Sequence, residues 1–114
     1  SLTTDAEMWD YMRQQALAHP DLTLGGPSLG WLKAALTECH ALTQLPSPEL
    51  PALVALGTQE RIVDVGPIHA RMTLWRRGTL DIYQNCEHEV LMERATARNN
   101  FFDSATQLFS KNRL

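Results

Sequence analysis

An unbroken apolar run from Ala52 to Leu56, closed by Gly57, constrains the fold more than any other part of this chain. Because polar residues do not alternate with the apolar ones, we expect a strand covered on both faces, as strands of parallel sheets are. The segment Gln44–Pro51 before it holds three of the six prolines and must be an extended connection. We therefore expect a boundary there, with helices before it and strands after it.

A strand, a helix and a second strand are predicted after the proline-rich segment. The residues Thr79–Tyr83 alternate, with Leu80 and Ile82 on one face, as a half-buried strand does. Between the strands, Pro67 suits the first turn of a helix that we expect to close at Arg76–Gly78. Two strands joined by a helix in so short a length form a parallel crossover unit, which predicts the α/β class.

Helices are also expected at both ends of the chain. The last segment, Glu89–Asn112, carries apolar residues along a helical surface, with Asn99–Asn100 marking a bend or a break between two pieces. Near the start, Thr4 is expected to cap a helix, since Glu7 three residues later completes a capping box. His19–Pro20 should end that helix, because the residue before a proline is disfavoured in helical geometry.

The first part of the chain is predicted to contain a second helix, which starts at Ser28. Both helices are amphipathic, and we expect their apolar stripes to pack as core, which would bury Cys39. Trp31 lies off the stripe and could pack on the first helix or line a lipid-facing surface. The stripes comprise Met8, Trp9, Met12 and Ala16 in the first helix and Leu29, Leu32, Ala35, Leu36 and Cys39 in the second.

Charge and cysteine content narrow the range of partners. The net charge of -3 and the pI near 5.7 give no basic patch, so we expect no nucleic-acid partner. Cys39 and Cys86 match no metal or redox spacing, and Gly25–Gly26 lacks the further glycines of a phosphate loop, so we expect neither metal nor cofactor. Free thiols and the lack of a signal or spanning segment predict a cytoplasmic protein. Because the chain opens at Ser1 directly into a helix cap, we interpret it as a fragment.

Glu60 and His88 each follow a predicted strand. Parallel strands present their functional loops at their carboxyl ends, so these two residues, 28 positions apart, can be adjacent in space. A carboxylate bonded to one imidazole nitrogen stabilises the cation that forms when the other nitrogen takes a proton from a serine. The alternative is an acidic loop and a histidine that caps a helix. Asp64 is the second candidate acid, although it lies near the start of the next helix, where an acid also favours the helix dipole.

Two segments around these residues resemble α/β-hydrolases of the lysophospholipase and monoacylglycerol lipase branch. The segment Leu53–Val63 is similar to the strand and acid loop of that branch, in which an apolar run ends in glycine, two further residues and the acid. The segment Asn85–Glu93 resembles its histidine loop, where an acid, aliphatic residues and a second glutamate follow the histidine. The resemblance implies that Glu60 is the triad acid and His88 the general base. The acid of this branch is usually aspartate, so Glu60 and Asp64 both stay open.

The resemblance divides the chain in two. Residues 47–114 correspond to the C-terminal part of the catalytic domain, and residues 1–46 are similar to the helical cap, or lid, of bacterial lysophospholipase-like members. It thus implies a partial α/β-hydrolase fold, with two cap helices before a strand–helix–strand–helix unit of a parallel sheet. The sequence has no Gly-x-Ser-x-Gly elbow and no histidine-glycine oxyanion segment, and neither Ser28 nor Ser47 lies on a strand-to-helix turn. The nucleophile is therefore expected outside this chain.

Two functions are open at this point. The first is a C-terminal fragment of a serine ester hydrolase that, when intact, would cleave a lipid ester such as a lysophospholipid or monoacylglycerol and contact the membrane peripherally. Alone, the fragment is expected to be inactive, and its uncovered strand edges predict a homo-oligomer. The second is a noncatalytic helical interaction domain in which both loops are merely polar. A carboxylate and an imidazole within hydrogen-bond reach would favour the hydrolase.

Overall fold

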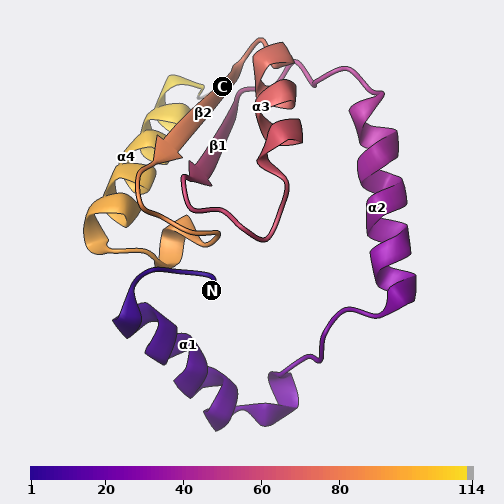
Figure 1. Ribbon diagram of the computed structural model, residues 1–114. Helices are drawn as coiled ribbons and strands as arrows, with labels where there is room; N and C mark the ends of the chain where they lie inside the picture. Colours follow the sequence, from indigo (N-terminus) through magenta and orange to yellow (C-terminus); the bar gives the residue numbers. More distant parts are fainter. Residues whose placement is uncertain (113–114) are drawn as a thin grey trace.

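The computed structural model describes residues 1–112, and the last two residues of the predicted C-terminal part, 113–114, lie outside the described residues. Two helices come first, and strands and helices then alternate (Figure 1). The elements in chain order are α1 at Ala6–Ala18, a 3₁₀ turn at Pro20–Leu22, α2 at Leu29–Thr43, β1 at Ala52–Gly57, α3 at Val65–Leu74, β2 at Gly78–Tyr83, a 3₁₀ turn at Val90–Met92 and α4 at Ala95–Lys111.

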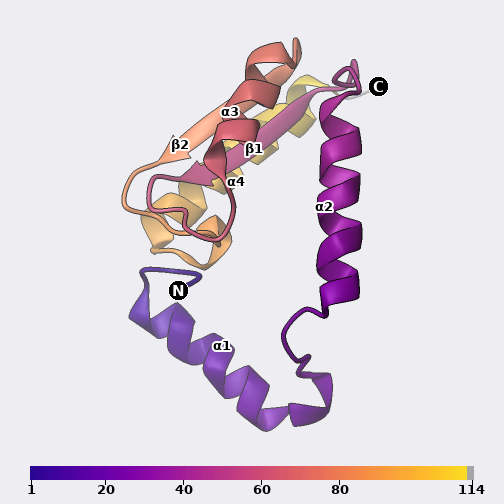
Figure 2. The ribbon, with the colours of Figure 1, turned by 45° about the vertical axis from the view of Figure 1, so that its right-hand side comes forward.

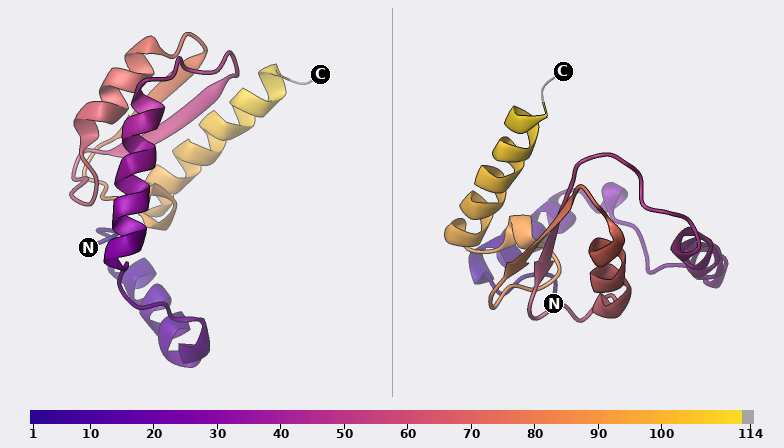
Figure 3. Two further views of the ribbon diagram at one scale, coloured as in Figure 1. Left: turned by 90° about the vertical axis from the view of Figure 1, so that its right-hand side faces the viewer. Right: turned by 90° about the horizontal axis from the view of Figure 1, so that it is seen from above.

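The described strands, β1 and β2, pair as a parallel sheet in which Ala52 is opposite Gly78 and Gly57 is opposite Tyr83. Seen from above, α3 and α4 lie on opposite sides of these strands (Figure 3). The predicted strand–helix–strand crossover is confirmed, and the mixed helices and parallel strands agree with the α/β class. Because the strands run in the same direction, the loops that follow them emerge at the same edge of the sheet.

A small apolar core lies at the carboxyl ends of the strands. Tyr83, Cys86 and Val90 are buried there, and Ala97 and Phe101 of α4 pack against them. Hydrophobic burial is therefore concentrated beneath the two loops that follow β1 and β2. These loops are supported by the best packed region of the described chain.

The predicted packing of α1 and α2 is wrong. Neither helix has a buried residue, Cys39 is exposed, and the side chain of Trp31 is 61% exposed. The two helices project from the sheet as an open arc that touches the rest of the chain near its ends (Figures 1 and 2). Their apolar stripes are therefore largely uncovered, although Met8 of α1 is half-buried and its Sδ accepts from the guanidinium of Arg98 on α4 at 3.6 Å. Across this range, no helix combines the length and the apolar composition needed to cross a membrane.

The start of α1 also differs from the prediction. Asp5, not Thr4, is the N-cap, and its carboxylate accepts hydrogen bonds from the backbone N–H groups of Glu7 and Met8 at 2.9 and 3.1 Å. The backbone N–H and the hydroxyl of Thr4 instead both donate to the carboxylate of Glu93, 89 residues further along the chain. The capping residue is thus shifted by one position by a distant contact.

Two predicted helix boundaries need correction. The helix α4 continues through Asn99–Asn100 without a break, and the interruption lies earlier, at Glu93–Arg94. The helix α3 ends at Leu74 instead of at Gly78, which begins β2. A Cβ atom on Gly78 would lie 2.9 Å from Cβ and from Cγ of Trp75, the C-cap residue of α3, so this glycine is required by the close packing of β2 on the end of the helix.

Candidate active site

The loop after β1 and the loop after β2 are joined by backbone hydrogen bonds. The N–H of Thr58 donates to Tyr83 O and the N–H of Gln59 donates to Cys86 O, both at 2.9 Å. The hydroxyl oxygen of Thr58 accepts from the N–H of Asn85, also at 2.9 Å. These bonds place the acid-bearing and histidine-bearing loops side by side and fix their register.

Two backbone positions allow this close approach. A Cβ atom at Gly57 would lie 2.2 Å from the carbonyl oxygen of Cys86, a separation that no side chain could tolerate. Asn85 has a positive φ of 58°, a left-handed conformation that asparagine adopts more readily than most residues. Gly57 lets the loops touch, and Asn85 turns the chain back toward β1.

Glu60 and His88 meet at the edge of these loops. Oε2 of Glu60 lies 2.6 Å from Nδ1 of His88, and the two side chains are 4% and 32% exposed. The second carboxylate oxygen, Oε1, accepts from the N–H groups of Ile62 and Val63 at 2.5 and 3.2 Å. The carboxylate is thus held on one side by its own loop and presents its other oxygen to the imidazole.

The hydrogen bonds to Glu60 favour its ionised form. Burial alone would raise the pKa of this carboxyl, but the N–H of Ile62, the imidazole of His88 and the N–H of Val63 outweigh burial and lower the pKa below its ordinary value of 4.5. An ionised carboxylate only accepts hydrogen bonds, so Nδ1 of His88 must carry the shared proton. The neutral imidazole then has a free lone pair on Nε2, and an imidazole in this state can act as a general base.

The other candidate residues have different roles. Asp64 is the N-cap of α3 and accepts from the N–H of Gly66 at 2.9 Å, so Glu60 is the acid that faces His88. Ser28 caps α2 through the N–H of Trp31, and Ser47 accepts from Arg71. Within residues 1–112, no serine is hydrogen-bonded to His88, and no three His, Cys, Asp or Glu side chains are grouped so as to hold a metal ion.

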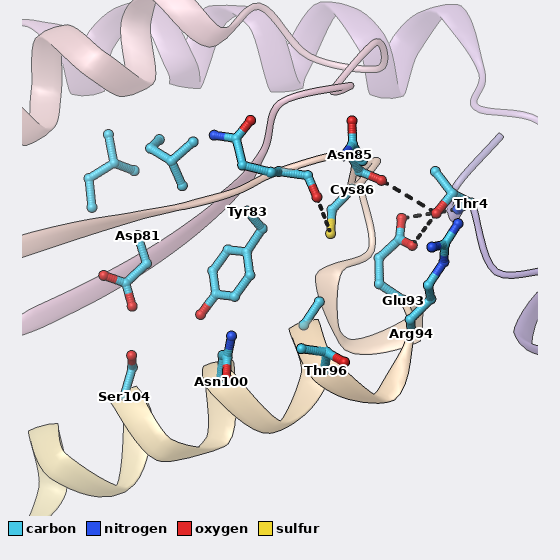
Figure 4. Close-up of a pocket in the computed structure, with 14 residues that line it drawn as sticks. Thr4, Asp81, Tyr83, Asn85, Cys86, Glu93, Arg94, Thr96, Asn100 and Ser104 are labelled. Atoms are coloured by element: carbon cyan, nitrogen blue, oxygen red, sulfur yellow. Dashed lines mark hydrogen bonds between the residues drawn. The ribbon is translucent and has the colours of Figure 1, made fainter.

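The sequence pattern gave no role to Glu93, which the structure shows to be buried. Its side chain is the most buried of the described large side chains, at 1% exposure, and it lies opposite Thr4 beneath the histidine loop (Figure 4). Glu93 and Thr4 also line a cavity of about 630 Å³ between β2 and α4, whose other polar groups include Asp81 and Ser104. Neither Glu60 nor His88 lines that cavity, so it is separate from the candidate site.

Comparison with known proteins relates most of this chain to a lysophospholipase. No family model matches the chain. A probable lysophospholipase L2 of Haemophilus influenzae is 28% identical over 93 residues, which are 81% of this chain. The chain is similar to a lysophospholipase. The matched segment is 30% of the length of that relative, so this chain spans less than a third of it. The similarity supports a relationship to ester hydrolases.

Proposed function

We propose that this chain is the acid and histidine part of a serine ester hydrolase of the lysophospholipase type. Glu60 is the residue that orients the imidazole, and His88 is the general base. The contact of 2.6 Å between Oε2 of Glu60 and Nδ1 of His88 carries this proposal, because it leaves Nε2 on a side chain that is 32% exposed. Asp64 is not assigned a catalytic role, because its carboxylate caps α3.

The proposed reaction needs a serine from outside this sequence. Nε2 of His88 takes the hydroxyl proton as the serine oxygen attacks the ester carbonyl of a lysophospholipid or monoacylglycerol. Glu60 stabilises the imidazolium that forms, which then gives its proton to the departing alcohol. A water molecule, deprotonated by the same nitrogen, then attacks the acyl carbon; as the bond to the serine oxygen breaks, the imidazolium returns the proton to that oxygen and the fatty acid leaves. In this scheme residues 1–46, with α1 and α2, form the cap over the site, and residues 47–114 belong to the catalytic domain.

Activity measurements with single substitutions test this assignment. The 114-residue chain alone should not hydrolyse a lysophospholipid or a p-nitrophenyl ester above the buffer rate. In a longer protein that carries this chain and the serine, His88→Ala and Glu60→Gln should each lower kcat by about 10⁴-fold. His69→Ala, on α3, is the matched control and should leave kcat unchanged, since no described residue uses its ring. Hydrolysis by the isolated chain that His88→Ala abolishes would contradict the proposal.

A noncatalytic docking domain is the second candidate. The exposed apolar side chains of α1 and α2, among them Trp9, Trp31 and Leu36, are of the kind that bind a partner helix or groove. This function gives no reason for a nearly buried carboxylate aimed at an imidazole. In a longer protein that carries this chain and the serine, a fluorophosphonate probe separates the two: His88→Ala should abolish labelling of the serine if His88 activates it, and should leave labelling unchanged if this chain is only a docking domain.

A further inference from the structure

We propose that Glu93 is a positioning residue that holds the histidine loop, residues 84–88, through an N-terminal strap made of residues 1–5. The strap leads directly into α1, so Glu93 links the first helix of the proposed cap to the proposed base. This inference rests on the proposed function for its effect on catalysis. The geometric part, that Glu93 and the strap fix the orientation of His88, can be tested by itself.

The carboxylate of Glu93 is surrounded by donors from two distant parts of the chain. Oε1 accepts from the backbone N–H of Glu87 at 2.7 Å and from that of Thr4 at 3.0 Å. Oε2 accepts from the hydroxyl of Thr4 at 2.6 Å. Burial would raise the pKa of Glu93, but these hydrogen bonds outweigh it and lower the pKa below 4.5. Glu93 is therefore ionised near neutral pH, and the donors to its carboxylate are the backbone N–H groups of Thr4 and Glu87 and the hydroxyl of Thr4.

The strap also binds the segment that directly follows the histidine loop. The N–H of Glu89 donates to Leu2 O at 2.8 Å, and the hydroxyl of Thr3 donates to Met92 O at 2.7 Å. Thr3 is buried, and its hydroxyl oxygen also accepts from the N–H of Asp5, the residue that caps α1. Glu87 and Glu89 are the immediate neighbours of His88, and the N–H of each is held. The backbone on both sides of the imidazole is thus fixed by Glu93 and the strap.

An ordinary structural role as a helix cap does not account for Glu93. An acid just before a helix usually accepts from the first free N–H groups of that helix. Arg94 is the N-cap of α4 and makes no side-chain capping bond, and the bonds found to the carboxylate of Glu93 come from Thr4 and Glu87. The carboxylate points away from the helix that follows it and toward the loop that carries His88 (Figure 4).

The chemistry of the site predicts how substitutions should rank. Glu93→Ala leaves the buried N–H groups of Thr4 and Glu87 without an acceptor, so the loop should loosen. Glu93→Gln can keep its oxygen toward both N–H groups, while its amide donates to the Thr4 hydroxyl. That hydroxyl can redirect its proton to Asn85 O, which is 3.4 Å away. Thr4→Val removes a single donor and keeps the backbone bonds, so its effect should be intermediate.

Two measurements on the hydrolase that carries this chain test the proposal. Glu93→Ala should lower kcat by about 10²-fold with KM changed less than about twofold, because the base is displaced while substrate binding is not. Glu93→Gln should restore most of kcat. In ¹⁵N-histidine spectra, the hydrogen-bonded Nδ1–H of His88 should be lost in Glu93→Ala and kept in Glu93→Gln. Glu38 is an exposed residue of α2, so Glu38→Ala is the control and should change neither kcat nor the Nδ1–H signal of His88.

The outcomes distinguish this proposal from the proposed function. If Glu93→Ala keeps both kcat and the Nδ1–H signal, Glu93 does not position His88. If Glu93→Gln lowers kcat as much as Glu93→Ala, then an oxygen acceptor at position 93 is not what holds the loop. If Glu93→Ala does not fold, Thr4→Val must still weaken the Nδ1–H signal, and an unchanged signal overturns the inference. If His88→Ala itself does not lower hydrolysis, the proposed function fails, while the spectra still decide whether Glu93 orients the ring.

Discussion

Gly57 is the residue on which the meeting of the two loops depends. It ends β1, and the carbonyl groups of Cys86 and Glu87 pass where any side chain would project. Its φ is not positive, so the requirement is for space and not for an unusual backbone angle. Because Glu60 follows three residues later and His88 follows Glu87, this contact sets the distance between carboxylate and imidazole.

Gly57→Ala should therefore separate the loops. The added Cβ would lie 2.2 Å from Cys86 O, and relieving this overlap should lower the free energy of unfolding by about 1–3 kcal/mol. Gly30→Ala is the matched control, since its nearest contact is 3.8 Å away and alanine favours a helix by up to about 1 kcal/mol. Urea unfolding measures both changes. An unchanged midpoint for Gly57→Ala would show that the loops adapt without it.

The sequence predicted the pairing of Glu60 with His88 but not the pairing of Thr4 with Glu93. Glu60 and His88 could be paired in advance because each follows a strand and parallel strands end at the same edge. Thr4 and Glu93 could not be paired, since the bond joins residues 89 positions apart and no periodicity marks it. The local rule for a capping box instead assigned Thr4 to the wrong hydrogen bond, because local patterns carry no information about a distant buried acceptor.

Among the elements, α2 depends on one arginine of α3 for its attachment to the α/β part. The guanidinium of Arg71 donates to the carbonyl oxygens of Leu42 and Leu45 and, at 3.3 Å, to the hydroxyl of Ser47. These carbonyls belong to the end of α2 and the connection after it, where the helix dipole favours a cation. With the strap at residues 1–5, Arg71 fixes the second end of the helical arc.

Replacing Arg71 should release that end. Arg71→Ala should lower the free energy of unfolding by about 1–2 kcal/mol and speed proteolysis between α2 and β1, because charged hydrogen bonds to the carbonyls are lost. Arg71→Lys should recover little, since a single ammonium cannot span the same acceptors. Arg76→Ala is the control, because the side chain of Arg76 is 83% exposed and its ion pair with Glu49 is long, with 3.9 Å between Nη2 and Oε1. Equal cleavage rates in all variants would contradict the role of Arg71.

The types of the helices and strands followed from sequence, but the packing of two helices did not. His19–Pro20 correctly predicted the end of α1 and Ser28 the start of α2, because prolines and caps act locally. An amphipathic stripe shows only that a helix has an apolar face and does not identify what covers it. The stripe with Leu36 and Cys39 was therefore expected in the core of this chain, although it is exposed there.

The dimensions of the whole molecule show that this chain exposes more surface than a compact protein of its mass. A compact protein of 12.8 kDa exposes about 6,300 Å² and has a radius of gyration of about 13 Å. This chain exposes 8857 Å², and its radius of gyration is 16.4 Å. The excess of about 2,600 Å² is of the size that obligate interfaces bury. The sheet adds to this surface, since the described strands have no further neighbours.

On its own, the 114-residue chain should therefore associate with itself. Light scattering after size exclusion should give a mass of at least twice 12.8 kDa, because each copy can cover apolar surface of another. Leu36→Lys should lower that mass if the stripe of α2 takes part, since Leu36 is 62% exposed and a buried lysine is costly. Thr37→Lys, one residue along and off the stripe, should leave the mass unchanged. A mass of a single chain together with a cooperative thermal transition would show instead that this small core is stable without a partner.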